Sequence, residues 1–218
     1  MKGWCAMSNN RSRHARRTRQ KKKSGAAGII IALVVVVLIA VIVLIFVSDS
    51  SYKGVKGKVY SVVYPQKYEI QVSKYAKEFH VEEPLVYAVI RTESNFQQDV
   101  ESHAGAIGLM QLMPETFDWL QEKLEGEVIY TTDALNDPDV NIRYGTYLLS
   151  YLLEQYDNNQ ETAIAAYNAG TSAVDEWLSD SSCSPDGKTL TQIPYEETSE
   201  YVARVTNAYE KYKLIYYS

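Results

Sequence analysis

The stretch IRTESNFQQDVESHAGAIGLMQLMP, residues 90–114, contains an acid, Glu93, where an apolar helix is expected to end. A polar loop follows it, and then an apolar turn with glycines on either side. Burial at a helix end raises the pKa of a carboxyl, as general acid catalysis near neutral pH requires. Taken alone, Glu93 reads more simply as a solvated acid at a helix end, and only the surrounding sequence favours a catalytic role.

Apolar residues recur at intervals of three and four from about Lys67 onward, and this periodicity indicates helices. Prolines suited to a first helical turn, a cap at Asp137 and a stop at Gly126 mark several ends. We expect helices at 68–79, 84–93, 114–125, 138–153, 160–168, 172–179 and 198–212. A loop is expected at 180–195, which is rich in Ser, Pro, Gly and Asp. The sequence predicts a mainly α domain of six to eight helices.

Three further motifs follow the Glu93-Ser94 pair, namely GLMQLMP at 108–114, AAYNAG at 165–170 and IPYEETSEYVARV at 193–205. Together the four motifs resemble, in the same order, those of the soluble lytic transglycosylase family of peptidoglycan-cleaving enzymes. The resemblance covers roughly residues 70–215. It implies a lysozyme-like helical domain of the goose type, with a cleft that binds glycan strands of alternating N-acetylglucosamine and N-acetylmuramic acid.

The resemblance also implies roles for individual residues. Glu93 matches the single catalytic acid and base of the family, and Ser94 completes the Glu-Ser signature. Ser102 matches a serine near the reacting sugar, and Tyr201 matches a tyrosine whose hydroxyl approaches the catalytic carboxyl. From the residues alone, Ser94 could instead form a local hydrogen bond at a helix end, and Tyr201 could be an ordinary core residue.

The other implied substrate-binding residues lie in two of the motifs. Gly108, Met110 and Gln111 match a turn that lines the family's cleft, where Met110 would offer an apolar contact and Gln111 hydrogen bonds to a sugar. Tyr167 and Asn168 match the family's Ala-Tyr-Asn segment. Alternatively, Met110 and Tyr167 belong to the core, and Asn168 is a helix-terminal residue.

The family's mechanism explains why one acid suffices. Ordinary glycoside hydrolysis uses two carboxyl groups. In a lytic transglycosylase the 6-hydroxyl of the muramic acid is the nucleophile, so one Glu protonates the leaving oxygen and then deprotonates that hydroxyl, which gives a 1,6-anhydro product. Asp99 and Glu101 follow Glu93 in the loop, and either could instead orient a water molecule, which would make the protein a hydrolytic muramidase.

The charges divide sharply along the 218 residues, whose formal net charge is -5. Residues 1–25 hold nine Lys and Arg and no acid, residues 26–47 hold no charge, and the rest therefore carries a net -14. An acidic domain binds nucleic acid poorly, so we expect no nucleic-acid partner for it. The basic run itself could be a nucleic-acid tail or a lipid-binding segment, although a topogenic flank is the simpler interpretation.

Residues 26–47 predict a transmembrane signal anchor, because 22 uncharged, mostly aliphatic residues can cross a bilayer as a helix. A cleaved signal peptide is the alternative, but its apolar region is normally shorter. The basic tail at 1–25 favours a cytoplasmic N-terminus. We therefore expect a single-pass protein of the cell membrane, with an extracytoplasmic linker at 48–66 and an extracytoplasmic catalytic domain at 67–218.

Two cysteines, Cys5 and Cys183, would lie on opposite sides of that membrane, so no disulfide framework is predicted. The three scattered histidines give no metal-ligand spacing, and we expect neither a metal nor a cofactor. The expected partners are peptidoglycan and the membrane, with cell-wall proteins left open. A different class of function also stays open, in which a catalytically silent domain binds peptidoglycan as a scaffold.

Overall fold

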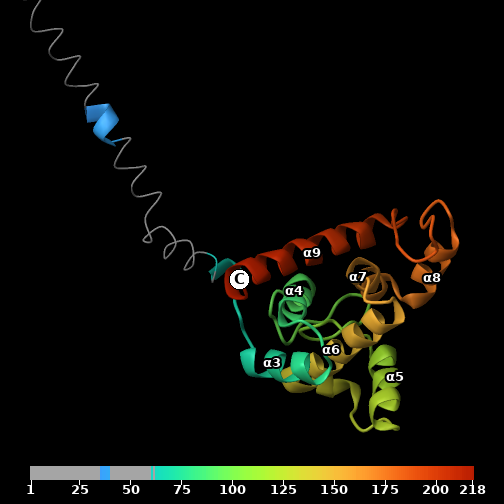
Figure 1. Ribbon diagram of the computed structural model, residues 1–218. Coiled ribbons are helices and arrows are strands. Elements are labelled where there is room, and N and C mark those ends of the chain that lie inside the picture. Colours follow the sequence, from blue (N-terminus) through green and yellow to red (C-terminus); the bar gives the residue numbers. More distant parts are fainter. Residues whose placement is uncertain (1–34, 40–59, 61) are drawn as a thin grey trace, which may run out of the picture. The chain divides into compact units, whose positions relative to one another are not determined.

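A computed structural model describes residues 35–39, 60 and 62–218. Residues 35–39 form a short helical segment, and Val59–Ser218 form one compact unit, so the two parts are described separately. The helices of the compact unit are α3 (Glu69–Glu78), α4 (Glu83–Ser94), α5 (Pro114–Glu125), the 3₁₀ helix η1 (Thr132–Asn136), α6 (Pro138–Gln155), α7 (Gln160–Ala169), α8 (Thr171–Ser179) and α9 (Glu196–Tyr216) (Figure 1). The prediction of a mainly helical domain is confirmed.

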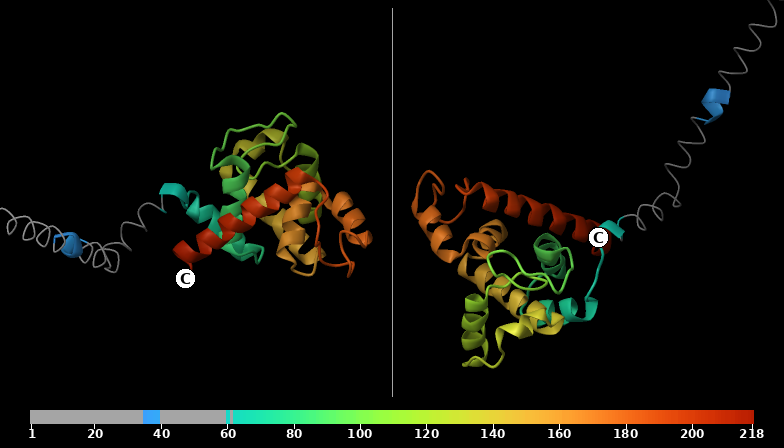
Figure 2. Two further views of the ribbon diagram at one scale, coloured as in Figure 1. Left: turned by 90° about the horizontal axis from the view of Figure 1, so that it is seen from above. Right: turned by 180° about the vertical axis from the view of Figure 1, so that it is seen from behind.

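Helix α4 is the centre of the compact unit. Pro84 lies in the first turn of α4, and the side chains of this helix from position 84 to position 90 are all buried. An apolar helix of this kind must be covered on several sides. Figure 1 shows α4 between α9 and α3, both of which contact it, and the left view of Figure 2 shows α9 crossing α4 obliquely. The helix ends at Asn95, whose left-handed backbone (φ 48°) turns the chain into the loop at 95–113.

Helix α6 supplies the second long support. Asp137 caps it by accepting a hydrogen bond of 2.9 Å from the backbone N–H of Asp139, and Pro138 fits its first turn. It packs against α3, η1, α5 and α7. The polar loop at 95–113 therefore runs between two rigid helices, α4 and α6.

Most predicted helix bounds agree with the structure to within a few residues, and Gly126 ends α5 as expected, in a left-handed conformation (φ 87°). Two features differ from the predicted pattern. The stretch after Gly126 contains η1, which was not among the expected helices. The last helix, α9, begins at Glu196 and not at the expected position 198, and the Thr198 hydroxyl donates to Asn168 Oδ1 at 2.8 Å.

The chain just before α3 packs on the compact unit. Tyr216 and Tyr212 of α9 donate hydrogen bonds of 2.7 and 3.0 Å to the carbonyls of Tyr64 and Pro65. The second part of the expected linker, from position 62, thus lies within the same unit as α9. We call residues 62–66 the strap.

The predicted anchor at 26–47 lies outside the described residues, apart from 35–39, as does the basic tail at 1–25 with Cys5. Among the residues that are described, no helix is both long and apolar enough to span a bilayer. Cys183 is buried and free.

Candidate active site

Glu93 lies in the last turn of α4, where its carboxyl is half-buried. The hydroxyl of Tyr201, from the first half of α9, donates a hydrogen bond of 2.6 Å to Glu93 Oε1. Tyr201 is itself buried (3% exposed), so the phenol holds the carboxyl in a fixed orientation. The pairing of α4 with α9 brings these two predicted site residues together.

The electrostatics of this pair suit proton transfer. Burial raises the pKa of the Glu93 carboxyl to about 7, although the Tyr201 hydrogen bond and the positive charge of Arg204 act in the opposite direction. Burial, and then the charge of Glu93, raise the pKa of Tyr201 well above its ordinary value, so the phenol stays a donor. A carboxyl with a pKa near 7 can both give and take a proton at neutral pH.

The turn at 108–112 is held next to this pair by buried polar contacts. Ser94, only 5% exposed, donates to the carbonyl of Leu109 at 2.8 Å and thereby ties the end of α4 to the turn. Asn141 of α6 accepts from the Met110 N–H at 2.8 Å and donates to the carbonyl of Ile107 at 2.9 Å. Because every one of these groups is buried or half-buried, losing one would leave unpaired polar atoms.

Gly108 explains why the turn needs a glycine. Its backbone has φ 79°, and a Cβ there would lie 2.3 Å from Asn141 Nδ2 and 2.4 Å from the carbonyl oxygen of Leu135. A side chain would therefore collide with the residue that holds the turn. Gly145 of α6 also has no room for a side chain, since a Cβ there would lie 2.4 Å from the Met110 side chain.

Gln111 and Tyr167 border the same region. The Tyr167 hydroxyl donates to the carbonyl of Met110 at 2.8 Å, which joins the end of α7 to the turn. Gln111 has a left-handed backbone (φ 47°), and its amide donates to the carbonyl of Gly108 at 2.9 Å. Burial, followed by the charge of Glu93, raises the pKa of Tyr167 well above its ordinary value, so this phenol too is a neutral donor.

A pocket of about 420 Å³ opens beside Gln111 and Tyr167, between α5, α6 and α7. Its walls include Trp119 and Tyr151, whose rings meet edge to face with centroids 5.0 Å apart. Polar side chains complete the lining, and Glu115 is its one charged member among the described residues. Aromatic faces with polar groups around them are suited to the alternating apolar and hydroxyl surfaces of sugars.

Three predicted substrate-binding residues are placed differently from Gln111 and Tyr167. Met110 is fully buried, so a contact between its side chain and a sugar would require that side chain to become exposed. Ser102 lies in the loop after α4, where its hydroxyl accepts from the N–H of Ala106 at 3.0 Å. Asn168 is exposed at the end of α7, and its side chain is bonded to Thr198. The roles implied for these residues stay predictions.

Sequence reasoning missed Asn141 and Arg204. A polar residue on the otherwise apolar face of α6 is the signal that could have revealed Asn141, because such a residue needs hydrogen-bond partners. Arg204 lies one turn after Tyr201, with its guanidinium carbon 6.0 Å from the centre of that ring. Asp99 and Glu101 are both exposed. Within residues 60 and 62–218, no three His, Cys, Asp or Glu side chains gather as metal ligands would.

A family model described as the transglycosylase SLT domain matches residues 71–189, which are more than half of the chain. The chain belongs to this family. The match includes the Glu-Ser pair, the turn at 108–112 and the Ala-Tyr-Asn segment, while Tyr201 lies beyond its end. The expected lysozyme-like SLT fold is thus confirmed for the helical domain.

Two relatives with known names are lytic murein transglycosylases. The soluble lytic murein transglycosylase of Escherichia coli is 34% identical over 150 residues, which are 68% of this chain and 23% of that protein. The membrane-bound lytic murein transglycosylase C of Sodalis glossinidius is 30% identical over an alignment of 167 positions, which covers 67% of this chain and 47% of that protein.

A solved SLT structure is similar in fold. It is an inactive mutant of the lytic transglycosylase Slt from Pseudomonas aeruginosa, in which one Glu is replaced by Gln. It is 33% identical, superimposes with a TM-score of 0.62, and matches 71% of this chain and 25% of that one. The chain spans about a quarter of the length of the soluble relatives.

Proposed function

We propose that this SLT protein is a membrane-anchored lytic transglycosylase that cleaves the β-1,4 bond between N-acetylmuramic acid and N-acetylglucosamine in peptidoglycan. The observation that carries the proposal is the Glu93 carboxyl, half-buried, with a pKa of about 7 and held by Tyr201. The named relatives are murein transglycosylases, which supports the substrate class.

Glu93 acts first as an acid in this mechanism. Its proton passes to the glycosidic oxygen while the bond from that oxygen to C1 of the muramic acid breaks, and the N-acetyl carbonyl of the substrate stabilises the positive charge left on C1. The carboxylate then takes the proton of the muramic 6-hydroxyl as its oxygen bonds to C1. The products are a free 4-hydroxyl on the N-acetylglucosamine and a 1,6-anhydro end, and Glu93 is protonated again.

The neighbouring groups position this carboxyl and the strand. Tyr201 fixes the orientation of Glu93, while Ser94 and Asn141 hold the turn that carries Gln111 beside it. The pocket lined by Trp119 and Tyr151 binds the neutral sugar faces of the strand. Binding through neutral groups is needed because the acidic domain does not attract an anionic wall.

The anchor is part of the proposal. Residues 26–47 span the membrane as an uncleaved helix, with residues 1–25 in the cytoplasm and the SLT domain outside. This arrangement is supported by the uncharged run and by nine basic residues before it. It also puts the domain in the compartment that holds peptidoglycan.

Digestion of purified peptidoglycan followed by mass analysis of the fragments tests the chemistry. We expect fragments with anhydromuramic ends. Each such fragment is lighter by one water, about 18 Da, than the same fragment with a reducing end, because no water is added when the bond breaks. Reducing ends alone would instead identify a hydrolytic muramidase. The Glu93→Gln variant should bind glycan but lose at least about 99% of turnover. If the unaltered protein binds without cleaving, the domain is a scaffold.

A further inference from the structure

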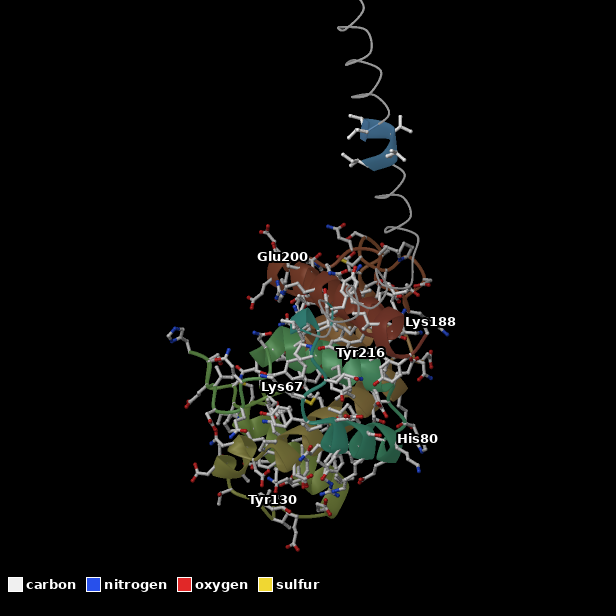
Figure 3. All side chains as sticks on the ribbon, turned by 90° about the vertical axis from the view of Figure 1, so that its left-hand side faces the viewer. Lys67, His80, Tyr130, Lys188, Glu200 and Tyr216 are labelled. Carbon is white, nitrogen blue, oxygen red and sulfur yellow. The ribbon has the colours of Figure 1, made fainter. Side chains whose placement is uncertain are left out.

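The end of the domain that the strap and the end of α9 form has an unusual surface. Four of its side chains are large, apolar and exposed: Val62 (80%), Val63 (45%), Leu214 (65%) and Tyr217 (42%). They come from the strap and from the end of α9 with the residue that follows it. Hydrogen bonds from Tyr216 to the carbonyl of Tyr64 and from Tyr212 to that of Pro65 hold the strap on α9. We call residues 62–67 and 211–217 the stem face. Figure 3 views the domain from this side and labels Lys67 and Tyr216 on it.

Charge is distributed very unevenly along the sequence from residue 48 to residue 218. Residues 48–68 contain Asp49 and four lysines, and residues 211–218 contain two lysines and no acid, so these stretches together carry +5. The remaining residues, 69–210, carry seven basic and 26 acidic side chains, a net of -19. Of the six lysines in the two positive stretches, Lys67, Lys211 and Lys213 belong to the stem face, and the other three precede it in the sequence.

Some of this positive charge is internally paired. Lys213 lies 3.7 Å from Glu82, and Tyr217 donates to Glu83 at 2.7 Å. Lys67 and Lys211 have no ion pair with any of the described residues. Tyrosine, lysine and aliphatic side chains together are the composition of segments that lie at the interface of a bilayer with water.

The length of the connection limits what can cover this face. Twelve residues, 48–59, separate the uncharged run from Tyr60, and twelve residues reach at most about 40 Å. With its anchor in the membrane, the stem face therefore stays close to the lipid surface whatever path these residues take.

We propose that the stem face docks on an anionic lipid surface, with Val62 and Leu214 entering the headgroup region and Lys67 and Lys211 near lipid phosphates. This interaction goes beyond the proposed enzymatic function, and it rests on the membrane anchor that is part of the same proposal. The -19 remainder of the domain is repelled by the same lipids. Docking through the stem face therefore gives the domain one preferred orientation, with the acidic part directed away from the membrane.

The test uses the full chain in lipid nanodiscs, with one environment-sensitive dye on a cysteine at position 214. Cys5→Ser and Cys183→Ala remove the native thiols. In discs that contain phosphatidylglycerol, we expect the dye emission to shift to shorter wavelength. Lipids that carry a doxyl quencher should reduce the intensity of this emission. Discs of phosphatidylcholine alone should give a smaller effect. The matched control carries the dye at Ile129, which is 49% exposed and lies outside the stem face.

Charge reversal separates docking from simple proximity. Lys67→Glu with Lys211→Glu should abolish quenching at position 214, whereas Lys77→Glu with Lys188→Glu makes the same change in net charge away from the stem face and should leave it intact. Equal emission at 214 and 129 in phosphatidylglycerol discs would overturn the proposal. So would failure of the chain to insert, or a shift that appears only in discs holding two copies of the chain, which would mean that a second copy covers the face.

Discussion

The hydroxyl of Tyr201 donates a 2.6 Å hydrogen bond to Glu93 Oε1, although the two residues lie 108 positions apart in the sequence. A hydrogen bond to a carboxylate stabilises the charged form and lowers its pKa. Tyr201 therefore opposes the effect of burial, which raises the pKa of Glu93 to about 7. Without it, the carboxyl would hold its proton to still higher pH.

Tyr201→Phe should shift the pH dependence of the reaction. Since general acid catalysis needs protonated Glu93, kcat/KM of the unaltered protein should fall as the pH rises through about 7. In the variant this fall should move to higher pH, while kcat drops about tenfold or more because the carboxyl is less well oriented (~1.4 kcal/mol per factor of ten). Turnover of soluble peptidoglycan fragments across pH measures both effects.

Tyr209→Phe is the matched control. Tyr209 lies on the same helix as Tyr201, and its hydroxyl also donates to a glutamate, Glu82, at 3.0 Å. Its pH profile should overlay that of the unaltered protein. An unchanged profile for Tyr201→Phe would show that the hydrogen bond does not tune Glu93.

Glu93→Gln should stabilise the fold at alkaline pH. The folded carboxyl has a pKa of about 7 against an ordinary 4.5, so between these values the folded state holds more protons than the unfolded state. Stability then falls as the pH rises through this window. Gln removes this loss, and we expect a gain of about 1–2 kcal/mol at pH 8, allowing for a half-buried group, and little change at pH 4.

Denaturant unfolding at the two pH values measures this difference. Glu122→Gln, at an exposed position of α5, controls for the loss of one negative charge. A Glu93→Gln gain of the same size at both pH values would contradict a raised pKa.

Asn141→Ala should damage the turn at 108–112. The change strands the Met110 N–H and the carbonyls of Ile107 and Leu135, all of which now bond to Asn141. We expect a loss of about 3–5 kcal/mol in unfolding free energy and a large loss of turnover. Asn141→Asp keeps the hydrogen-bond acceptor but loses the donors, so its stability and turnover should lie between those of Asn141→Ala and the unaltered protein.

Thermal unfolding and peptidoglycan turnover report on the two consequences separately. Asn136→Ala removes an exposed amide from the end of η1 and should change neither by much. An Asn141→Ala protein with normal stability would mean that water replaces these hydrogen bonds.

Moderate salt should raise turnover of soluble peptidoglycan fragments. The domain and its substrate are both anionic, and at about 0.1 M salt the screening length falls to about 10 Å. A rise of up to about twofold is expected as repulsion is screened. Activity that fell steeply over the same range would mean that charged contacts bind the substrate.

Local patterns predicted the helices and the acid at the end of α4 well, because periodicity, prolines and Gly126 act within a few residues. Motif order gave the family. These signals do not reveal pairings across the chain. Ser94 and Asn141 are examples, because the residues of the turn that they bind lie 15 and 31 positions away from them in the sequence.

The strap shows the same limit at the domain boundary. Its short Val/Tyr run, which follows Gly, Ser and Lys, suggests that the second part of the tether packs on the domain, but it does not show which residues the strap meets. The strap is held in place by Tyr212 and Tyr216, about 150 positions later. It is also held by Arg91, which donates to the carbonyl of Val63 and lies over the ring of Tyr64. No local rule connects these positions.

The strap also fixes how much wall one molecule can survey. Reach is proportional to the number of free residues, and the accessible volume rises with the cube of reach. Fastening the strap, residues 62–66, shortens the stretch between the uncharged run and the fastened chain from the nineteen residues 48–66 to the fourteen residues 48–61, which leaves about two fifths of the volume. Anchored in this way, the protein would work on a thin inner layer of peptidoglycan, where strands newly added at the membrane are found before older ones.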